Sequence, residues 1–176
     1  VVRAFARLPH DERRLVIGGV PEAGVEEAGL RRWSRELALG DRLVVLGRLP
    51  PDRLPALLQG AVALVFPSLY EGFGLPLAEA MAMGTPVVAS TTPALVEIAG
   101  GAAELVDPQD TSAIAAAMAK LAGDPQRRRE LAEAGLRRAR AFRWEATAAR
   151  TLEVYRQVIA GDAGRPPIGG IGRRSA

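Results

Sequence analysis

Short apolar runs of strand length alternate with helical stretches along most of the chain, and this alternation constrains the fold more than any other feature. The runs typical of strands are residues 15–19, 42–47, 61–66, 85–90 and 103–106. Strands that alternate with helices form a parallel sheet through right-handed crossovers, with helices on both faces. The sequence therefore predicts an α/β fold, a Rossmann-like doubly wound parallel sheet, with 61–66 as a central strand buried on both faces.

Helix signals fill the intervals between these runs. The expected helices are residues 1–8, 22–39, 53–59, 76–83, 94–98, 111–121, 125–141 and 144–159. Asp52, Asp110 and Asp124 each stand just before a helical stretch, where an aspartate can accept hydrogen bonds from the first free amides. Trp144 and Tyr155 lie on roughly one face of the last helix, which favours packing over sugar stacking.

Composition excludes several classes of protein and site. The chain has no cysteine, so it has no disulfide, thiolate zinc site or thiol nucleophile. No apolar run approaches the ~20 residues that span a bilayer, and no signal peptide is visible. The net charge of +3 is small, and the arginines of 127–143 spread around a helix, so nucleic acid is not an expected partner. His10 is the only histidine, and a lone imidazole near the chain start is a poor candidate ligand or base.

The stretch 61–84 reads as a strand, a glycine-bearing loop and a short helix. Gly72 and Gly74 allow a sharp bend or a close approach to a ligand. Pro76 fits the start of a helix and Gly84 the residue just past its end. The free amides and positive dipole end of this helix would point into the loop, which makes it a candidate site for an anion such as a phosphate.

Two carboxylates flank this candidate anion site. Glu71 lies in the loop, and Glu79 lies about one turn into the helix. A carboxylate accepts hydrogen bonds from vicinal hydroxyls, such as those of a ribose or a pyranose. Amides that can donate hydrogen bonds to a phosphate, flanked by two such carboxylates, indicate a nucleotide-sugar site. The alternatives are a loop acid that faces water and a first-turn acid favoured by the helix dipole.

Other polar or glycine-bearing segments also follow strands. They are Gly18-Gly19, Gly47-Arg48, 68–75 and 90–92. In a parallel sheet of this kind, ligands bind beyond the carboxyl ends of the strands. We therefore expect these segments to share one edge of the sheet, whatever the identity of the ligand.

The segment 67–84 resembles the signature of retaining glycosyltransferases of the two-Rossmann-domain GT-B architecture, in the large family 4. The resemblance rests on Glu-x7-Glu, Glu-Gly-Phe-Gly-Leu-Pro and Glu-Ala-Met-Ala-x-Gly-x-Pro-Val-Val, all present as they stand. It continues through Val106-Asp107-Pro108 and Phe142-x-Trp144 to Tyr155, and it covers nearly all of residues 15–159.

The resemblance implies roles for individual residues. Glu71 would be the catalytic residue, a carboxylate that touches the hydroxyls of the transferred sugar, and Glu79 would accept hydrogen bonds from the ribose diol. Donor-binding residues implied by main-chain contacts are Gly72, Phe73, Gly74 and Leu75 beside the donor, and Gly47, Arg48 and Leu49 beside the nucleobase. Gly18 and Gly19 either approach the diphosphate or only turn the chain. There is no Asp-x-Asp motif, so no metal and no cofactor are expected.

The resemblance also implies an enzyme that moves a hexose from a nucleotide diphosphate sugar to an acceptor hydroxyl. The amino-acid sequence around Glu71 and Trp144 looks most like that of mannosyltransferases. GDP-mannose is therefore the first expectation for the donor, and a UDP-sugar remains open. The alternatives are a nucleotide-sugar 2-epimerase of the same fold and a non-catalytic nucleotide-sugar-binding module or docking module for a partner. The full-length protein is expected in the cytoplasm, with peripheral association at the inner face of the membrane left open.

Parts of the family pattern have no counterpart in the chain. Family members carry an Arg and a Lys in a loop after the first strand of this domain, and these cations meet the diphosphate. We expect residues 1–160 to be the donor-binding domain, the C-terminal half of a GT-B fold with its first strand missing, and 161–176 to be a flexible tail. Without an N-terminal acceptor-binding domain, the chain alone is expected to be inactive.

Overall fold

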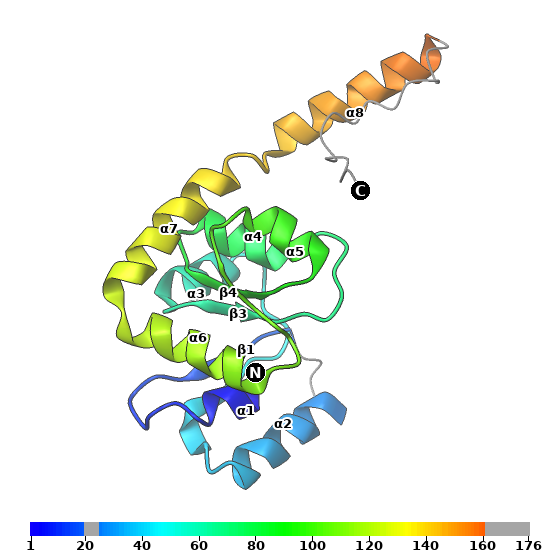
Figure 1. Cartoon of the computed structure of the whole chain (residues 1–176). Helices are drawn as coiled ribbons and strands as arrows, with labels where there is room; N and C mark the ends of the chain where they lie inside the picture. The colour runs from blue at the N-terminus through cyan, green and yellow to red at the C-terminus, as the bar shows by residue number, and fades with distance from the viewer. Residues whose placement is uncertain (20–24, 161–176) are drawn as a thin grey trace, which may run out of the picture. The chain divides into compact units, whose positions relative to one another are not determined.

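The computed structural model describes residues 1–19 and 25–160 of the chain (Figure 1). They fall into two compact units, Val1–Arg140 and the described part of Ala141–Ala176, and each unit is described by itself below. The segment expected to be a flexible tail, 161–176, lies outside the described residues, and the single domain expected over 1–160 stays a prediction.

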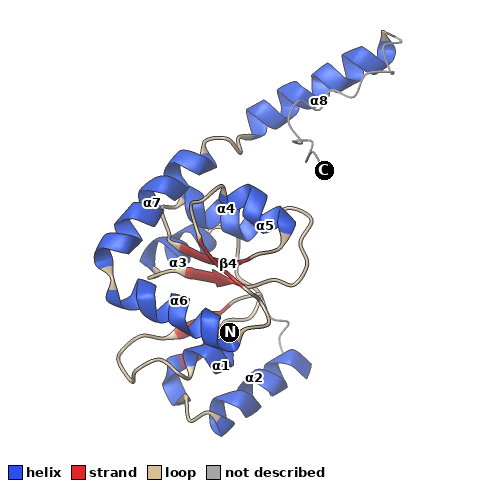
Figure 2. Cartoon of the chain, viewed as in Figure 1, coloured by secondary structure: helices blue, strands red, loops and turns tan. Residues whose placement is uncertain are grey.

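Strands and helices alternate through the first unit (Figure 2). The strands are β1 (Leu15–Ile17), β2 (Leu43–Val45), β3 (Leu64–Phe66), β4 (Val87–Ser90) and β5 (Glu104–Val106). The helices are α1 (Val2–Phe5), α2 (Val25–Glu36), the 3-10 turn η1 (Gly40–Arg42), α3 (Leu54–Gly60), α4 (Leu75–Ala82), α5 (Pro93–Ala99), α6 (Thr111–Gly123) and α7 (Pro125–Ala139). All five predicted strands are confirmed, each shorter than the apolar run that predicted it.

The strands form two parallel sheets. In one, β1 pairs with β2 so that Leu15 stands opposite Leu43. In the other, β4 lies between β3 and β5, with Val88 opposite both Val65 and Glu104. Helices α4 and α5 cover one face of this three-stranded sheet and α6 covers the other (Figure 1). The predicted α/β fold, with parallel strands and helices on both faces, is therefore confirmed.

The prediction that residues 61–66 form a central strand buried on both faces is wrong. The strand in this run, β3, lies at the edge of its sheet, and its three residues are only half-buried. The middle strand is β4, whose four residues are all buried. A strand with a hydrogen-bonded neighbour on one side only has less of its surface covered, so an apolar run alone does not identify the central strand.

Helix α4 packs closely against α7. Leu77 and Met81 on α4 are completely buried. On α7, Gly135 comes so near that a Cβ added there would lie 3.2 Å from the Met81 Cγ. Glycine at this position lets the two helix backbones approach closely.

Two of the three predicted aspartate caps are confirmed. Asp110 accepts hydrogen bonds from the amides of Ser112 and Ala113 at the start of α6, and Asp124 accepts one from Arg127 at the start of α7. Asp52 does not cap α3, which begins after Arg53 without a side-chain cap. Gly84 has the left-handed conformation just past the end of α4, as predicted.

The second unit contains α8 (Trp144–Ile159). Trp144 and Tyr155 lie on this helix with exposed fractions of 79% and 60%, so this unit does not itself supply the packing predicted for them. No helix in the described residues is long and apolar enough to cross a membrane.

Glu104 ties β5 to two helices. Its Oε1 accepts hydrogen bonds from the Lys120 Nζ on α6, at 2.9 Å, and from the Arg127 Nε on α7, at 2.6 Å. The Glu104 side chain is only 17% exposed. Burial raises the pKa of Glu104, but the hydrogen bonds from the two cations outweigh burial and lower the pKa below its usual range.

This lowered pKa predicts how the stability depends on pH. A carboxyl whose folded pKa is depressed stabilises the fold above its unfolded pKa, near 4.5, and that contribution is lost as the pH falls through the folded pKa. At pH 7, Glu104→Gln should lower the free energy of unfolding by about 1–3 kcal/mol, because it removes charge-assisted bonds to two cations. Denaturant titrations should show the difference from the wild type shrinking below about pH 4.5.

Glu133→Gln provides the matched control. Glu133 forms an ion pair with Arg137 at 3.8 Å and is 71% exposed, so its substitution should change the free energy of unfolding by less than about 0.5 kcal/mol. Parallel pH profiles for the wild type and Glu104→Gln would contradict the assignment.

Candidate functional site

The predicted site segments all follow strands of the first unit. Gly18 and Gly19 follow β1, residues 47–49 come soon after β2, 68–75 follow β3, and Ser90 closes β4. Because the strands within each sheet are parallel, their carboxyl ends share one edge of that sheet. The structure joins the segments in two groups, one at each sheet.

The loops after β1 and β2 contact each other. The Gly19 amide donates a hydrogen bond to the Gly47 carbonyl at 3.2 Å, and a Cβ added at Gly18 would lie 2.6 Å from the Leu49 Cδ1. Gly19 also has a φ of +82°, which favours glycine. Four of the predicted residues are therefore brought together here, and Arg48 lies exposed beside them.

The loop between β3 and α4 has the turn that its glycines predict. Gly74 has a φ of +95°, and a Cβ added there would lie 2.3 Å from the Leu95 Cδ2 on α5. Any other residue at this position would meet both backbone strain and a steric clash. No side chain caps the start of α4, so the helix dipole and the first-turn backbone face the loop without a built-in anion.

Both predicted carboxylates are accessible. Glu71 is half-buried in the loop, and Glu79 is exposed on α4. Glu79 lies one full turn into the helix, and the first turn of α4 holds no acid. The interpretation of Glu79 as a first-turn acid favoured by the dipole therefore loses its basis. Both groups can accept hydrogen bonds from ligand hydroxyls.

Three hydroxyls connect the start of this loop to the end of β4, in segments that were predicted to share the sheet edge but whose hydroxyls were given no individual role. The buried Ser90 Oγ donates a hydrogen bond to the Ser68 carbonyl at 2.6 Å and lies 3.2 Å from the Thr92 Oγ1. The Ser68 Oγ donates to the Tyr70 carbonyl at 3.0 Å. The available signal in the sequence was one polar residue that closes the otherwise apolar run 87–90.

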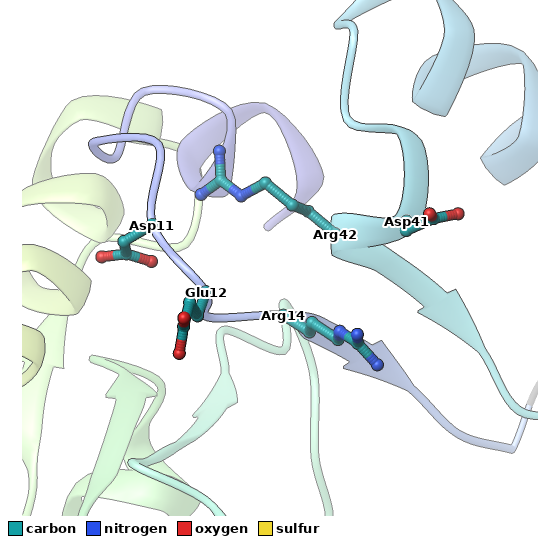
Figure 3. Close-up of a pocket in the computed structure, with 5 residues that line it drawn as sticks. All are labelled: Asp11, Glu12, Arg14, Asp41 and Arg42. Carbon is teal, nitrogen blue, oxygen red and sulfur yellow. The ribbon is translucent and has the colours of Figure 1, made fainter.

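A cavity of about 440 Å³ lies away from these loops, at the amino ends of β1 and β2 (Figure 3). Its lining is charged: Asp11, Glu12, Arg14, Asp41 and Arg42. The guanidinium groups of Arg14 and Arg42 point away from each other (Figure 3). Arg42 packs over the Phe5 ring and donates to the Pro9 carbonyl, so it holds α1 to the strand region. These side chains do not converge on a ligand position.

In the part of the chain that the structure describes, acidic and imidazole side chains do not cluster in a metal-binding arrangement. Within residues 1–19 and 25–160, no three of them come together closely enough to hold a metal ion. The residues that could contact a ligand at the carboxyl edge are therefore glycines, two carboxylates, hydroxyls and Arg48.

Comparison with known proteins identifies the family. The family profile described as "Glycosyl transferases group 1" matches residues 1–138. The chain is 43% identical over 129 residues to the MMP alpha-(1->4)-mannosyltransferase of Mycolicibacterium hassiacum, an overlap of 71% of this chain and 31% of that protein. It is 35% identical over 164 residues to the D-inositol 3-phosphate glycosyltransferase of Corynebacterium urealyticum, covering 89% of this chain and 39% of that protein.

A solved structure has the same fold. The sucrose-phosphate synthase of Thermosynechococcus elongatus superposes with a TM-score of 0.83 at 35% sequence identity, over 91% of this chain and 41% of that one. The chain thus spans between about three and four tenths of the length of these proteins. A profile match over most of the chain, together with this superposition, shows that the chain belongs to the group 1 glycosyl transferases and has the fold of a GT-B C-terminal domain.

Proposed function

We propose that the chain is the donor-binding part of a retaining glycosyltransferase that moves a hexose from a nucleotide diphosphate sugar to an acceptor hydroxyl. The observation that carries the proposal is the turn between β3 and α4. There, a helix start that no side chain caps follows the loop carboxylate Glu71 by four residues and precedes Glu79 by one turn. Membership of the group 1 glycosyl transferases supports sugar transfer as the reaction.

The start of α4 supplies the chemistry that a departing diphosphate needs. As the bond between the sugar and the phosphate breaks, negative charge develops on the phosphate oxygens. In the proposed complex, the main-chain amides of Gly72, Phe73, Gly74 and Leu75 donate hydrogen bonds to this charge, and the dipole of α4 adds to their effect. Because these groups are already oriented, they stabilise the transition state without first reorganising.

The two carboxylates contact different parts of the donor. Glu71 accepts hydrogen bonds from the hydroxyls of the transferred sugar, positions it, and offsets part of the positive charge that develops on the sugar ring. Glu79 accepts hydrogen bonds from the two hydroxyls of the ribose. Gly18 and Gly19 allow the diphosphate to approach the backbone, while Gly47, Arg48 and Leu49 contact the nucleobase through the main chain. No metal or cofactor takes part in this scheme.

Mannose is the first expectation for the transferred sugar, from GDP-mannose. It is supported by the 43% identity to a mannosyltransferase and by 40% identity over 111 residues to the O-antigen chain mannosyltransferase B of Escherichia coli. A UDP-sugar is the alternative donor, because the proteins similar to the chain are not all named as mannosyltransferases.

The split sheet suggests what the active enzyme adds. Among the described residues, β1 and β3 each have a hydrogen-bonded neighbour on one side only. A strand supplied from upstream of Val1 would join the two sheets, and the loop after it would bring further cations to the diphosphate. An acceptor-binding domain would complete the enzyme, which we place in the cytoplasm and for which peripheral association at the inner face of the membrane is left open.

Calorimetry with the active enzyme tests the division between the two acids. Titration with four ligands should show binding of one matched pair only, either GDP and GDP-mannose or UDP and UDP-glucose. Glu79→Gln should weaken both about 10- to 100-fold, because it weakens hydrogen bonds to the ribose worth about 1.5–3 kcal/mol each. Glu71→Gln should weaken the binding of the nucleotide sugar but not that of the nucleotide. Substitution of the exposed Glu133, Glu133→Gln, should change neither affinity. Absence of binding to all four ligands would favour a docking module and contradict the proposal.

A transfer assay compares this chain with a protein extended upstream of Val1 to include an acceptor-binding domain. The chain alone should show little or no turnover, because two charge-assisted contacts to the diphosphate would be lost, which weakens donor binding about 10²-fold or more. The extended protein should transfer the hexose with retention of configuration. Robust turnover by the chain alone would sink this expectation, and conversion of the nucleotide sugar to its C2 epimer would favour the epimerase.

Hydrogen exchange tests the proposed additional strand. In the extended protein, amides of β1 and β3 should exchange about 10-fold more slowly or better than in this chain, because a new strand would pair with both. Amides of β4 already have neighbours on both sides and serve as the internal control. Equal exchange at β1 and β3 in the two proteins would refute the joined sheet.

A further inference from the structure

The hydroxyl of Ser90 makes a committed hydrogen bond at the carboxyl end of β4. Ser90 is completely buried, and its Oγ lies 2.6 Å from the carbonyl oxygen of Ser68, on the segment that follows β3. A carbonyl can only accept, so the single hydroxyl proton of Ser90 is donated to it. This bond connects the end of the most buried strand to the loop that carries Glu71.

The direction of the next bond follows from the first. The Thr92 Oγ1 lies 3.2 Å from the Ser90 Oγ, and because the proton of Ser90 is already used, Thr92 must be the donor. Thr92 is the residue before α5, where a threonine side chain commonly caps the helix, yet it makes no cap bond there. Its hydroxyl donates a hydrogen bond to Ser90 and does not cap α5.

Ser68 carries the network to the peptide bond before Glu71. Its own Oγ donates to the Tyr70 carbonyl at 3.0 Å. The Tyr70 carbonyl and the Glu71 amide belong to one planar peptide unit, so fixing the carbonyl fixes the plane from which the Glu71 side chain departs. The hydroxyls of Thr92, Ser90 and Ser68 are here called the hydroxyl bridge. This bridge thus extends to the peptide bond that precedes Glu71, the candidate catalytic carboxylate.

Apolar packing does not hold this turn. The side chains of Leu69 and Tyr70, which lie between Ser68 and Glu71, are 66% and 88% exposed. A turn whose side chains point to solvent keeps its shape through backbone hydrogen bonds, and the hydroxyl bridge supplies two of them. The geometry of Glu71 therefore depends on hydroxyls that the ligand itself need not touch.

We propose that Ser90 and Ser68 are positioning residues for Glu71, an inference that rests on the proposed function. They act on the sugar end of the donor, because Glu71 contacts the sugar, and not on the nucleotide end. Loss of the hydroxyl bridge therefore lowers the rate of transfer while leaving nucleotide binding intact. A purely structural role would instead lower stability without separating these two measurements.

The test measures kcat, KM and nucleotide affinity in the active form of the enzyme. Ser90→Ala and Ser68→Ala should each lower kcat about 10- to 100-fold, since small displacements of a reacting group have effects of this size. The dissociation constant for the nucleoside diphosphate should stay within about twofold, because its contacts are unaltered. Ser68→Thr, which keeps the hydroxyl on a half-buried side chain, should retain most of the wild-type kcat.

Thr85→Val is the matched control. The Thr85 Oγ1 donates to the Leu58 carbonyl at 2.8 Å, and Thr85 is 3% exposed, so its side chain is about as buried as that of Ser90. It lies before β4, at the end of the strand away from Ser90. Thr85→Val should lower the melting temperature about as much as Ser90→Ala but leave kcat within about twofold.

Hydrogen exchange of the Glu71 amide separates failure of this inference from failure of the proposed function. Ser90→Ala should speed exchange in residues 68–72, and Thr85→Val should not. If the wild type transfers no sugar, the proposed function fails, and the exchange rates still decide whether the hydroxyl bridge holds the loop. Unchanged exchange, a normal kcat in Ser90→Ala, or an equal loss of kcat in Thr85→Val would overturn the inference.

Discussion

Burial of β4 is the constraint on which the candidate site depends. Its four residues are buried, it is paired on both edges, and helices cover both faces of its sheet. A strand enclosed in this way has little freedom to shift, because any displacement would break hydrogen bonds on two sides and open voids in the core. Its carboxyl end therefore provides a fixed point, and Ser90 at that end is bonded directly to the loop before Glu71.

A second contact fixes the other end of the same loop. Gly74 has a φ of +95°, and a Cβ added there would lie 2.3 Å from the Leu95 Cδ2, so Leu95 would have to shift to admit any side chain. Leu95 is itself completely buried on α5. The loop is thus held by β4 and Thr92 at its start and by α5 at its end. The backbone between these points is presented at the edge of the sheet, where the start of α4 lacks a side-chain cap.

Much of this arrangement was predictable from the sequence because it is local. Asp110 and Asp124 cap their helices through amides two or three residues away. Gly84 adopts the left-handed conformation just past the end of α4. Features that depend on distant partners were not predictable. The apolar run at β3 gave no indication that the strand lies at a sheet edge, since that depends on which strands pair. The partner of Ser90 is 22 residues away, and no local pattern identifies it.

The exposed side chains beside Glu71 explain why hydroxyls hold this loop. A leucine or tyrosine packed into the core would anchor the turn through the hydrophobic effect, but it would also draw the adjacent backbone away from solvent and from any ligand. Hydrogen bonds from a buried serine to a main-chain carbonyl avoid that conflict, because they fix orientation from behind and need no apolar contact in front. The loop can then be both fixed and open, which is the combination that a carboxylate needs in order to meet a sugar at one defined position.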